Sequence, residues 1–163
     1  MTLAIDCGGG GIKGSVVDEK GTMVAPARRV PTPYPLPPGL LVRTVCDLAA
    51  GLPRATRVTM GMPGMIRHGV VVATPHYITK DGPRSRVLPE LVEQWDHFDM
   101  GRAIAAALSL PTKVLNDAEV AGAGAVTGRG LEMIITLGTG LGNAVFDGGV
   151  LAPHVEVSQG FVR

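Results

Sequence analysis

The amino-acid sequence predicts an α/β fold in which helices flank a mixed β-sheet. Three observations support this prediction. Short apolar segments separated by glycine-rich turns occupy the first thirty residues, as in antiparallel hairpins. After residue 40, segments with helical spacing alternate with short apolar segments, which is typical of strands joined by helices. The chain has 163 residues, 45% of them hydrophobic, which is enough for one domain and a small part of another.

The N-terminal part is expected to form a hairpin followed by a stiff connector. The apolar residues TLAI lead to Asp6, which we expect at the end of a buried strand. Segments 15–18 and 22–30 flank the residues EKG, which are typical of a hairpin turn. Residues 31–39 contain five prolines, so they are expected to form neither a helix nor a central strand.

The rest of the chain predicts three helices and several strands. In the first helix, Leu41, Val45, Leu48 and Leu52 fall on one face. The polar, irregular segment 76–95 is expected to be a surface loop with a short helical piece. The helices are expected at 40–52, 99–110 and 117–128, and the strands at 57–62, 69–75, 113–116 and 131–138, with a turn at 63–64 and an Asp-Gly hairpin over 143–152.

Composition and charge exclude several classes of function. The formal net charge is +1, and the basic residues are scattered, with Arg28 and Arg29 the only adjacent pair. With 4% aromatic residues the chain has little capacity to stack on bases, so we expect no nucleic-acid partner. Cys7 and Cys46 form no disulfide framework. No signal peptide and no apolar segment of membrane-spanning length is found, so a cytoplasmic location without membrane contact is expected.

Four consecutive glycines lie between Asp6 and Lys13. They fit the dinucleotide pattern G-x-G-x-x-G, but that site requires a helix after the loop, and here a strand and a turn follow. A P-loop requires glycine directly before the lysine, and here Ile12 stands there. Two interpretations remain. One is a plain β-turn with surplus glycine, and the other is a hairpin loop whose N–H groups bind phosphate while Asp6 faces the accompanying metal.

A second glycine loop repeats this design. Gly138, Thr139, Gly140 and Gly142 again lie between two predicted strands. One such loop is common as a turn, but two in one small domain favour two walls of a phosphate-binding site.

Asn116 and Asp117 lie where a predicted strand meets the start of a predicted helix. Either residue alone is explained well by N-capping. The functional alternative is that Asp117 is a general base that takes a proton from a substrate hydroxyl. Because the helix dipole favours the carboxylate form, we expect a weak base that contributes through its position more than through its pKa.

Six motifs together resemble the ROK sugar kinases (repressor, open reading frame, kinase), and most closely their polyphosphate/ATP glucokinase branch. The motifs are IDCGGGGIKG, GMPG, ATPH, VLNDAEVAG, LGTGLGNAVFDGG and PHVEVSQ, and their order and spacing fit over nearly the whole chain. The resemblance implies the actin-like ATPase fold, which is ribonuclease H-like.

The resemblance also implies roles for individual residues. Asp117 corresponds to the catalytic base, and Asp6 faces Mg²⁺ indirectly. The residues that correspond to phosphate-binding positions are Asp6, Gly8, Gly9, Gly10, Gly11, Lys13, Gly138, Thr139 and Gly140. Those that correspond to sugar-binding positions are Gly64, Asn116, Asp117, Glu156 and Gln159. An amide and a carboxylate suit a sugar because each can pair with two hydroxyls.

The sequence departs from the family pattern at several positions. Gln159 stands where the family has a histidine that contacts the sugar and, in many members, zinc. The cysteine-rich zinc motif is absent and the four histidines show no ligand spacing, so no structural zinc is expected. His76 stands near an asparagine of many relatives, and we interpret it as a polar loop residue rather than a base.

The resemblance further implies two lobes around a nucleotide cleft. Residues 1–115 are expected to form the N-terminal lobe, and 116–163 the start of the second lobe, whose adenosine-binding segment would lie further on. If Arg163 is the true end, the cleft lacks a wall, and weak or absent activity is expected. A homodimer is expected because ROK kinases are often dimers.

The leading hypothesis is a sugar kinase that transfers a phosphoryl group from ATP or polyphosphate to the 6-hydroxyl of glucose or a related hexose, with Mg²⁺ and with Asp117 as the base. The alternative is a truncated, non-catalytic module that binds sugar or regulates. A third interpretation is an α/β domain with capped helices and glycine turns, which requires both loops and the Asn-Asp pair to be coincidences.

Overall fold

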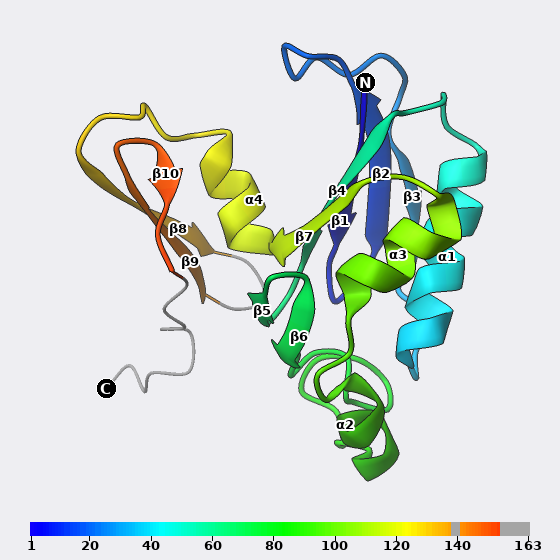
Figure 1. Cartoon of the computed structure of the whole chain (residues 1–163). Coiled ribbons are helices and arrows are strands. Elements are labelled where there is room, and N and C mark those ends of the chain that lie inside the picture. Colours follow the sequence, from blue (N-terminus) through cyan, green and yellow to red (C-terminus); the bar gives the residue numbers. More distant parts are fainter. Residues whose placement is uncertain (138–140, 154–163) are drawn as a thin grey trace.

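A computed structural model describes residues 1–137 and 141–153 of the chain, and a five-stranded sheet lies at its centre (Figure 1). The strand order is β3-β2-β1-β4-β7. The strands are β1 (Thr2–Cys7), β2 (Ile12–Val17), β3 (Arg28–Val30), β4 (Arg57–Met62) and β7 (Thr112–Asn116). The first three strands pair antiparallel, whereas β1–β4 and β4–β7 are parallel, so the expected mixed sheet is confirmed.

Helices cover both faces of this sheet (Figure 1). On one face lie α1 (Pro38–Ala50) and α3 (Met100–Leu108), and α1 buries Leu41, Val45 and Leu48, three of the residues expected on its apolar side. On the other face lies α4 (Asp117–Ala123). The glycines of the strands separate the two faces, because a Cβ on Gly14 would collide with Leu48 of α1, whereas a Cβ on Gly61 would contact α4.

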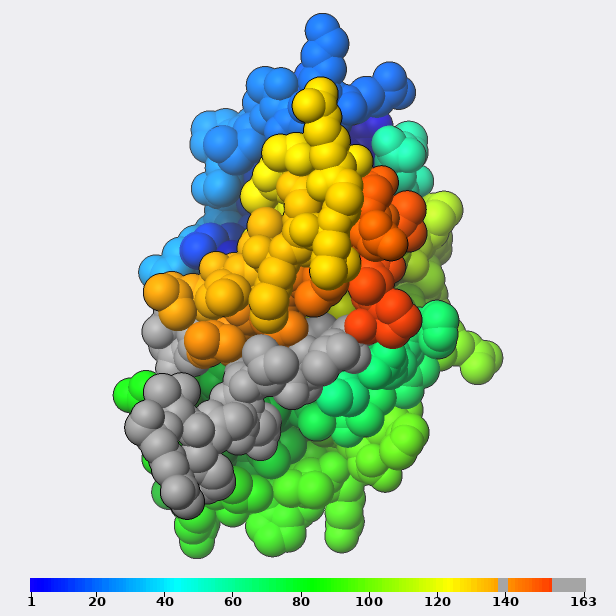
Figure 2. Space-filling model, turned by 90° about the vertical axis from the view of Figure 1, so that its left-hand side faces the viewer, coloured from blue at the N-terminus to red at the C-terminus, as the bar shows by residue number. Residues whose placement is uncertain are grey.

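A second, three-stranded sheet packs against α4. Its strands are β8 (Leu131–Leu137), β9 (Leu141–Asp147) and β10 (Val150–Leu151), in the order β10-β9-β8. The expected Asp-Gly hairpin is confirmed, since Gly148 and Gly149 both have positive φ between β9 and β10. Figure 2 shows this side, with the segments from α4 to β10 in yellow to red across its middle. One face of β8 leaves its apolar side chains 52–83% exposed, namely Leu131, Met133, Ile135 and Leu137.

The strand expected over 22–30 and the helix expected over 117–128 are both shorter in the structure. Of segment 22–30 only the last three residues form a strand, because the preceding Ala-Pro-Ala stretch contains a proline, which cannot donate to the ladder. The helix expected over 117–128 ends at Ala123. Its continuation is glycine-rich, and the N–H groups of Thr127, Gly128 and Arg129 donate to the Glu132 carboxylate instead.

The expectation that segment 76–95 forms a surface loop is wrong in part, because several residues of this segment belong to the core. Tyr77 is fully buried and Trp95 is 2% exposed. The Trp95 indole donates a hydrogen bond of 2.9 Å to the Leu36 carbonyl, and its ring packs against Tyr77 with centroids 5.5 Å apart. The expected short helical piece is α2 (Pro89–Trp95).

A small hairpin, β5 (Met65–Arg67) and β6 (Val70–Ala73), follows the turn after β4. Among the described residues, no helix is both long and apolar enough to cross a membrane. Strand β7 ends at Asn116 and α4 begins at Asp117, one residue after the expected boundary between residues 115 and 116. The division into two lobes stays a prediction.

Candidate functional site

The strand register aligns five residues in one row across the central sheet. Leu115 of β7 pairs with Gly61 of β4, and Gly61 pairs with Asp6 of β1. Asp6 pairs with Lys13 of β2, and Lys13 pairs with Arg29 of β3. Residues directly opposite one another in a sheet share a face. The row therefore places Asp6, Lys13 and Arg29 on the face that α4 covers, here called the site face.

Asp117 lies above this row because it is the first residue of α4. A Cβ atom on Gly61 would lie 3.3 Å from the Asp117 Cα and 3.4 Å from Val120. A side chain on Gly61 would force the helix and the strand apart by a few tenths of an ångström. The candidate base is thus adjacent to β4, one strand away from Asp6.

The Asp117 carboxyl is partly buried, and this burial raises its pKa above the ordinary value of 3.8. The negative charge of Asp6 raises the pKa further, while the hydrogen bond from the Ala118 N–H and the charge of His76 lower it. The expectation of a weak base held by the helix dipole is therefore wrong in direction. Burial outweighs the favourable helix terminus, so Asp117 is a stronger base than an exposed aspartate.

Asn116 caps α4, as the structural interpretation expected. Its Oδ1 accepts a 2.8 Å hydrogen bond from the Ala118 N–H, and Glu119 completes a capping box by accepting from the Asn116 N–H at 3.0 Å. The Asn116 Nδ2 donates to the Gly64 carbonyl at 2.9 Å. Gly64 has a φ of +109°, and a Cβ there would collide with the Ala73 carbonyl. Asn116 and Gly64 are thus brought together, and their role as sugar ligands stays a prediction.

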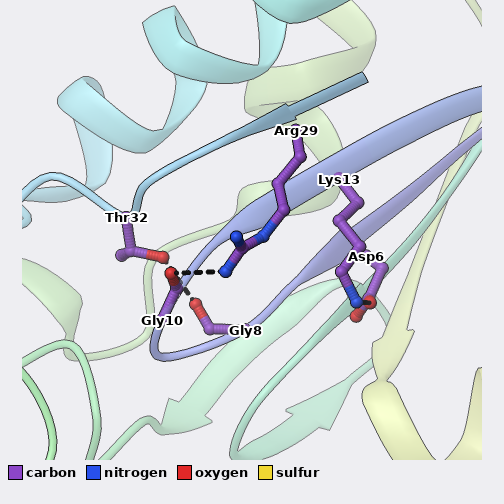
Figure 3. Close-up of polar contacts among 6 residues, drawn as sticks. All are labelled: Asp6, Gly8, Gly10, Lys13, Arg29 and Thr32. Carbon is purple, nitrogen blue, oxygen red and sulfur yellow. Dashed lines mark hydrogen bonds and ion pairs between the residues drawn. The ribbon is translucent and has the colours of Figure 1, made fainter. Parts of the chain in front are cut away.

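The glycine loop between β1 and β2 is held by hydrogen bonds to its carbonyl groups (Figure 3). The Thr32 hydroxyl donates to the Gly8 carbonyl at 2.7 Å, and the Arg29 guanidinium donates to the Gly10 carbonyl at 3.1 Å. The Gly8 N–H donates across the loop to Gly11 at 2.9 Å. In the described part of the chain, the N–H groups of Gly9 and Gly10 have no acceptor. A fixed loop with free N–H groups is suited to an anion.

Asp6 and Lys13 form an ion pair at the start of this loop (Figure 3). The distance from Nζ to Oδ2 is 3.4 Å, and the two side chains are 55% and 59% exposed. One exposed, loosely paired carboxylate suits Mg²⁺, which binds through one or two carboxylates together with substrate phosphates and water. Within the described residues no cluster of three or more histidine, cysteine or acidic residues could hold a metal by itself.

Three buried polar atoms have no hydrogen-bond partner among the described residues. They are Tyr34 Oη, His76 Nδ1 and Tyr77 Oη. Burial raises the pKa of Tyr34 to about 12 and that of Tyr77 well above its ordinary value, so both hydroxyls stay protonated. Buried polar groups normally have partners. His76, interpreted as a polar loop residue, thus combines a buried unpaired nitrogen with an electrostatic interaction with Asp117.

Several predicted site residues lie outside the described residues, namely Gly138, Thr139, Gly140, Glu156 and Gln159. The strands on either side of the second glycine loop pair antiparallel, with Leu137 opposite Leu141, which confirms the expected hairpin. The GMPG motif contains Gly61, but no local pattern indicates its contact with α4, and none indicates the contact of Thr32 with the glycine loop. In the sequence, Arg29 stands out only as part of a basic pair. Its position at the glycine loop depends on the register of β3 against β2, which spacing along the chain does not predict.

The fold and the site define a class of protein. Residues 2–153 match the model of the ROK family, and the chain belongs to this family. The match to solved ROK sugar kinases confirms the expected actin-like ATPase fold.

Among named relatives, the chain is 29% identical to the polyphosphate glucokinase of Mycobacterium tuberculosis, over 94% of this chain and 56% of the relative. It is 33% identical to the solved inorganic polyphosphate/ATP-glucomannokinase of Arthrobacter sp. strain KM, covering 96% of this chain and 62% of that one, with a TM-score of 0.78. A ROK family glucokinase from Streptomyces griseus, solved with glucose and AMPPNP, is 27% identical over 99% of this chain and 50% of that one, with a TM-score of 0.76. The chain thus spans about half the length of the curated relatives it matches.

Proposed function

We propose that the chain is the site-bearing part of a sugar kinase that transfers a phosphoryl group from ATP or polyphosphate to the 6-hydroxyl of glucose or a related hexose. The observation that carries the proposal is the position of Asp117. Its Cα lies against Gly61, which pairs directly with Asp6, the residue that opens the glycine loop. Asp117 therefore lies at the start of α4 against β4, the strand next to β1, where the glycine loop begins. This arrangement favours a base on the acceptor side and phosphate on the donor side, as positioning for in-line phosphoryl transfer needs.

On the acceptor side, Asp117 would take the proton of the sugar hydroxyl. Its raised pKa brings it closer to the pKa that suits a general base near neutral pH. Asn116 and Gly64 lie beside it, and the unpaired Nδ1 of His76 is a buried polar atom that a sugar hydroxyl would satisfy. These groups favour a polyhydroxylated acceptor over an apolar one.

On the donor side, the free N–H groups of Gly9 and Gly10 and the Lys13 ammonium would bind phosphate oxygens. Asp6 would hold Mg²⁺ together with those phosphates. Bound there, Mg²⁺ would neutralise charge on the transferred phosphoryl group. The second loop, with Gly138, Thr139 and Gly140, and the sugar positions Glu156 and Gln159 remain predictions from the resemblance.

The test is formation of glucose 6-phosphate by the purified chain with Mg²⁺ and either ATP or polyphosphate. Asp117→Asn should abolish the product because it removes the base while keeping the size of the side chain. Asp47→Asn is the matched control, since Asp47 is exposed on α1, on the opposite face of the sheet. It should leave the rate unchanged.

The outcomes separate the two candidate functions. Glucose 6-phosphate that forms with the wild-type chain and not with Asp117→Asn supports the kinase function. Glucose binding without product from either donor would instead favour the non-catalytic sugar-binding module. The expected homodimer and cytoplasmic location stay predictions, which gel filtration with light scattering and fractionation would test.

A further inference from the structure

Arg29 is a cation at the glycine loop to which the proposed function assigns no role. It pairs with Lys13 in the β2–β3 register, so its side chain begins on the site face. The guanidinium lies against Gly11, because a Cβ on Gly11 would be 2.7 Å from the Arg29 Nε and 2.8 Å from its Nη2. One hydrogen bond, to the Gly10 carbonyl, holds it there (Figure 3).

The charge of Arg29 is not neutralised by the described residues. Neither the Lys13–Asp6 nor the His97–Asp96 ion pair involves Arg29. The side chain is exposed, and a guanidinium has five N–H donors, of which the Gly10 carbonyl takes one. Arg29 thus offers donors and a positive charge at the edge of the loop.

The neighbouring Arg28 shows that this arrangement is specific to one side of β3. Arg28 pairs with Gly14, whose missing Cβ faces Leu48 of α1. Its guanidinium lies at Gly51, at the C-terminal end of α1. Two adjacent arginines of equal charge therefore lie on opposite faces of the sheet, and only Arg29 reaches the glycine loop.

We propose that Arg29 binds the phosphate groups of the donor that lie furthest from the transferred group, and so extends the donor site along the strand row. The proposal rests on the proposed use of the glycine loop as the donor site. Its ligand is a linear phosphate chain, which either polyphosphate or the triphosphate of ATP can supply.

The row of paired residues across the sheet sets the direction in which the bound phosphate chain runs. Neighbouring strands lie about 4.8 Å apart, so the backbone of Arg29 is about 5 Å beyond that of Lys13 and about 10 Å beyond that of Asp6. Asp117 lies at the other end, over Gly61. A donor whose terminal phosphate lies between Asp6 and Asp117 therefore passes Lys13 first and Arg29 afterwards. Arginine suits this position because its planar fork matches phosphate oxygens.

A purely structural role for Arg29, fixing the loop through the Gly10 carbonyl, predicts a different result. If Arg29 only shapes the loop, its loss weakens binding of every phosphate compound equally. If it contacts distal phosphates, its loss weakens binding of long chains and leaves short ones unchanged. The dependence of affinity on chain length therefore separates the two roles.

The experiment measures dissociation constants by calorimetry for pyrophosphate, tripolyphosphate, tetrapolyphosphate and ATP, each with Mg²⁺. The variants are Arg29→Met, which keeps the apolar stem, Arg29→Lys, which keeps the charge, and Lys13→Met in the inner part of the site. Arg28→Met is the matched control for net charge. Circular dichroism checks that each variant folds, and Arg29→Lys keeps the test valid if Arg29→Met does not fold.

We expect Arg29→Met to weaken tetrapolyphosphate binding about tenfold, as for the loss of a charge-assisted hydrogen bond, and to leave pyrophosphate binding unchanged. Arg29→Lys should restore part of the loss, and Arg28→Met should have no effect. If Arg29→Met changes the dissociation constant for ATP by the same factor as that for tripolyphosphate, both kinds of donor reach Arg29.

Two results would overturn the proposal. Equal weakening for all chain lengths, or equal effects of Arg28→Met and Arg29→Met, would reduce Arg29 to a structural or non-specific role. If Lys13→Met weakens binding but Arg29→Met does not, the inference fails and the donor site stands. If the wild-type chain binds none of the four compounds, the donor site of the proposed function fails as well.

Discussion

The Cα atom of Asp117 lies 3.3 Å from the position that a Cβ on Gly61 would occupy. Strand β4 and the first residue of α4 are therefore closer than a Cβ on Gly61 would permit without a small shift, and the position of the carboxylate depends on a residue without a side chain. We expect Gly61→Ala to shift α4 by a few tenths of an ångström. Phosphoryl transfer should fall about tenfold, because small displacements of catalytic groups are costly.

The same substitution should change stability little. Mild overpacking at this contact is expected to cost about 1 kcal/mol in the free energy of unfolding. Urea unfolding and the transfer assay are measured together. The control is Gly39→Ala, because among the described residues a Cβ on Gly39 has only the Arg43 side chain within reach, at 3.7 Å. Loss of activity in proportion to loss of folded protein would contradict a positional effect.

The raised pKa of Asp117 predicts the acid side of the pH profile. The base form is lost as pH falls through the raised pKa, so activity should decline at a higher pH than an ordinary aspartate with a pKa of 3.8 would give. Between that ordinary value and the raised one, the folded state holds more protons than the unfolded state. The free energy of unfolding contributed by this group therefore falls as pH rises across that window.

His76 should influence this titration. Its charge lowers the pKa of Asp117, so His76→Asn, which removes the charge, should raise that pKa and move the acid limb to higher pH. The measurement is a carbon NMR titration of the Asp117 carboxyl, which needs no activity. An unchanged pKa in the variant would show that His76 does not act on Asp117.

Trp95 should be important for stability. Trp95→Phe removes the indole donor and leaves the buried Leu36 carbonyl without a partner, at an expected cost of about 2 kcal/mol in the free energy of unfolding. Unfolding is followed by circular dichroism, because the variant lacks the chain's single tryptophan. Phe98→Leu alters a ring contact without removing a hydrogen bond and should cost less. Equal costs would mean that the hydrogen bond contributes little.

Glu132 should stabilise the loop that follows α4 in a pH-dependent manner. Its carboxylate accepts hydrogen bonds from the Thr127 and Gly128 N–H groups, and the first of these is the largest cause of its lowered pKa. A lowered pKa stabilises the fold above the ordinary value of 4.5, and this effect is lost as pH falls through the folded value. Glu132→Gln should therefore lower Tm at neutral pH and have less effect in acid. Glu93→Gln, at an exposed position on α2, is the control. A Tm difference that does not vary with pH would rule out this linkage.

Local patterns predicted much of the central sheet and the start of the site. The apolar segment before Asp6 and the spacing of Leu41, Val45 and Leu48 were sufficient for β1 and α1. The Asn-Asp pair predicted the start of α4 correctly because capping depends on residues within a few positions.

The remaining features depend on contacts between distant segments. Arg29 reaches the glycine loop only because β3 pairs with β2 in one register, which spacing along the chain does not reveal. The raised pKa of Asp117 follows chiefly from the burial of its carboxyl, which depends on tertiary packing, so the local helix terminus predicts the wrong direction. The burial of Tyr77 and Trp95 was missed because the polar residues around them conceal a part of the core.

The parallel pairings of β1 with β4 and of β4 with β7 have a consequence for synthesis of the chain. Thr2 pairs with Arg57, and Val58 with Thr112, so each pairing joins residues more than fifty positions apart. The hairpin of β1 and β2 can close early, but the row that places Asp117 over Gly61 cannot form until β7 has left the ribosome. Long-range strand pairing is the slow part of folding. A nascent chain should therefore present the glycine loop well before it presents the completed site.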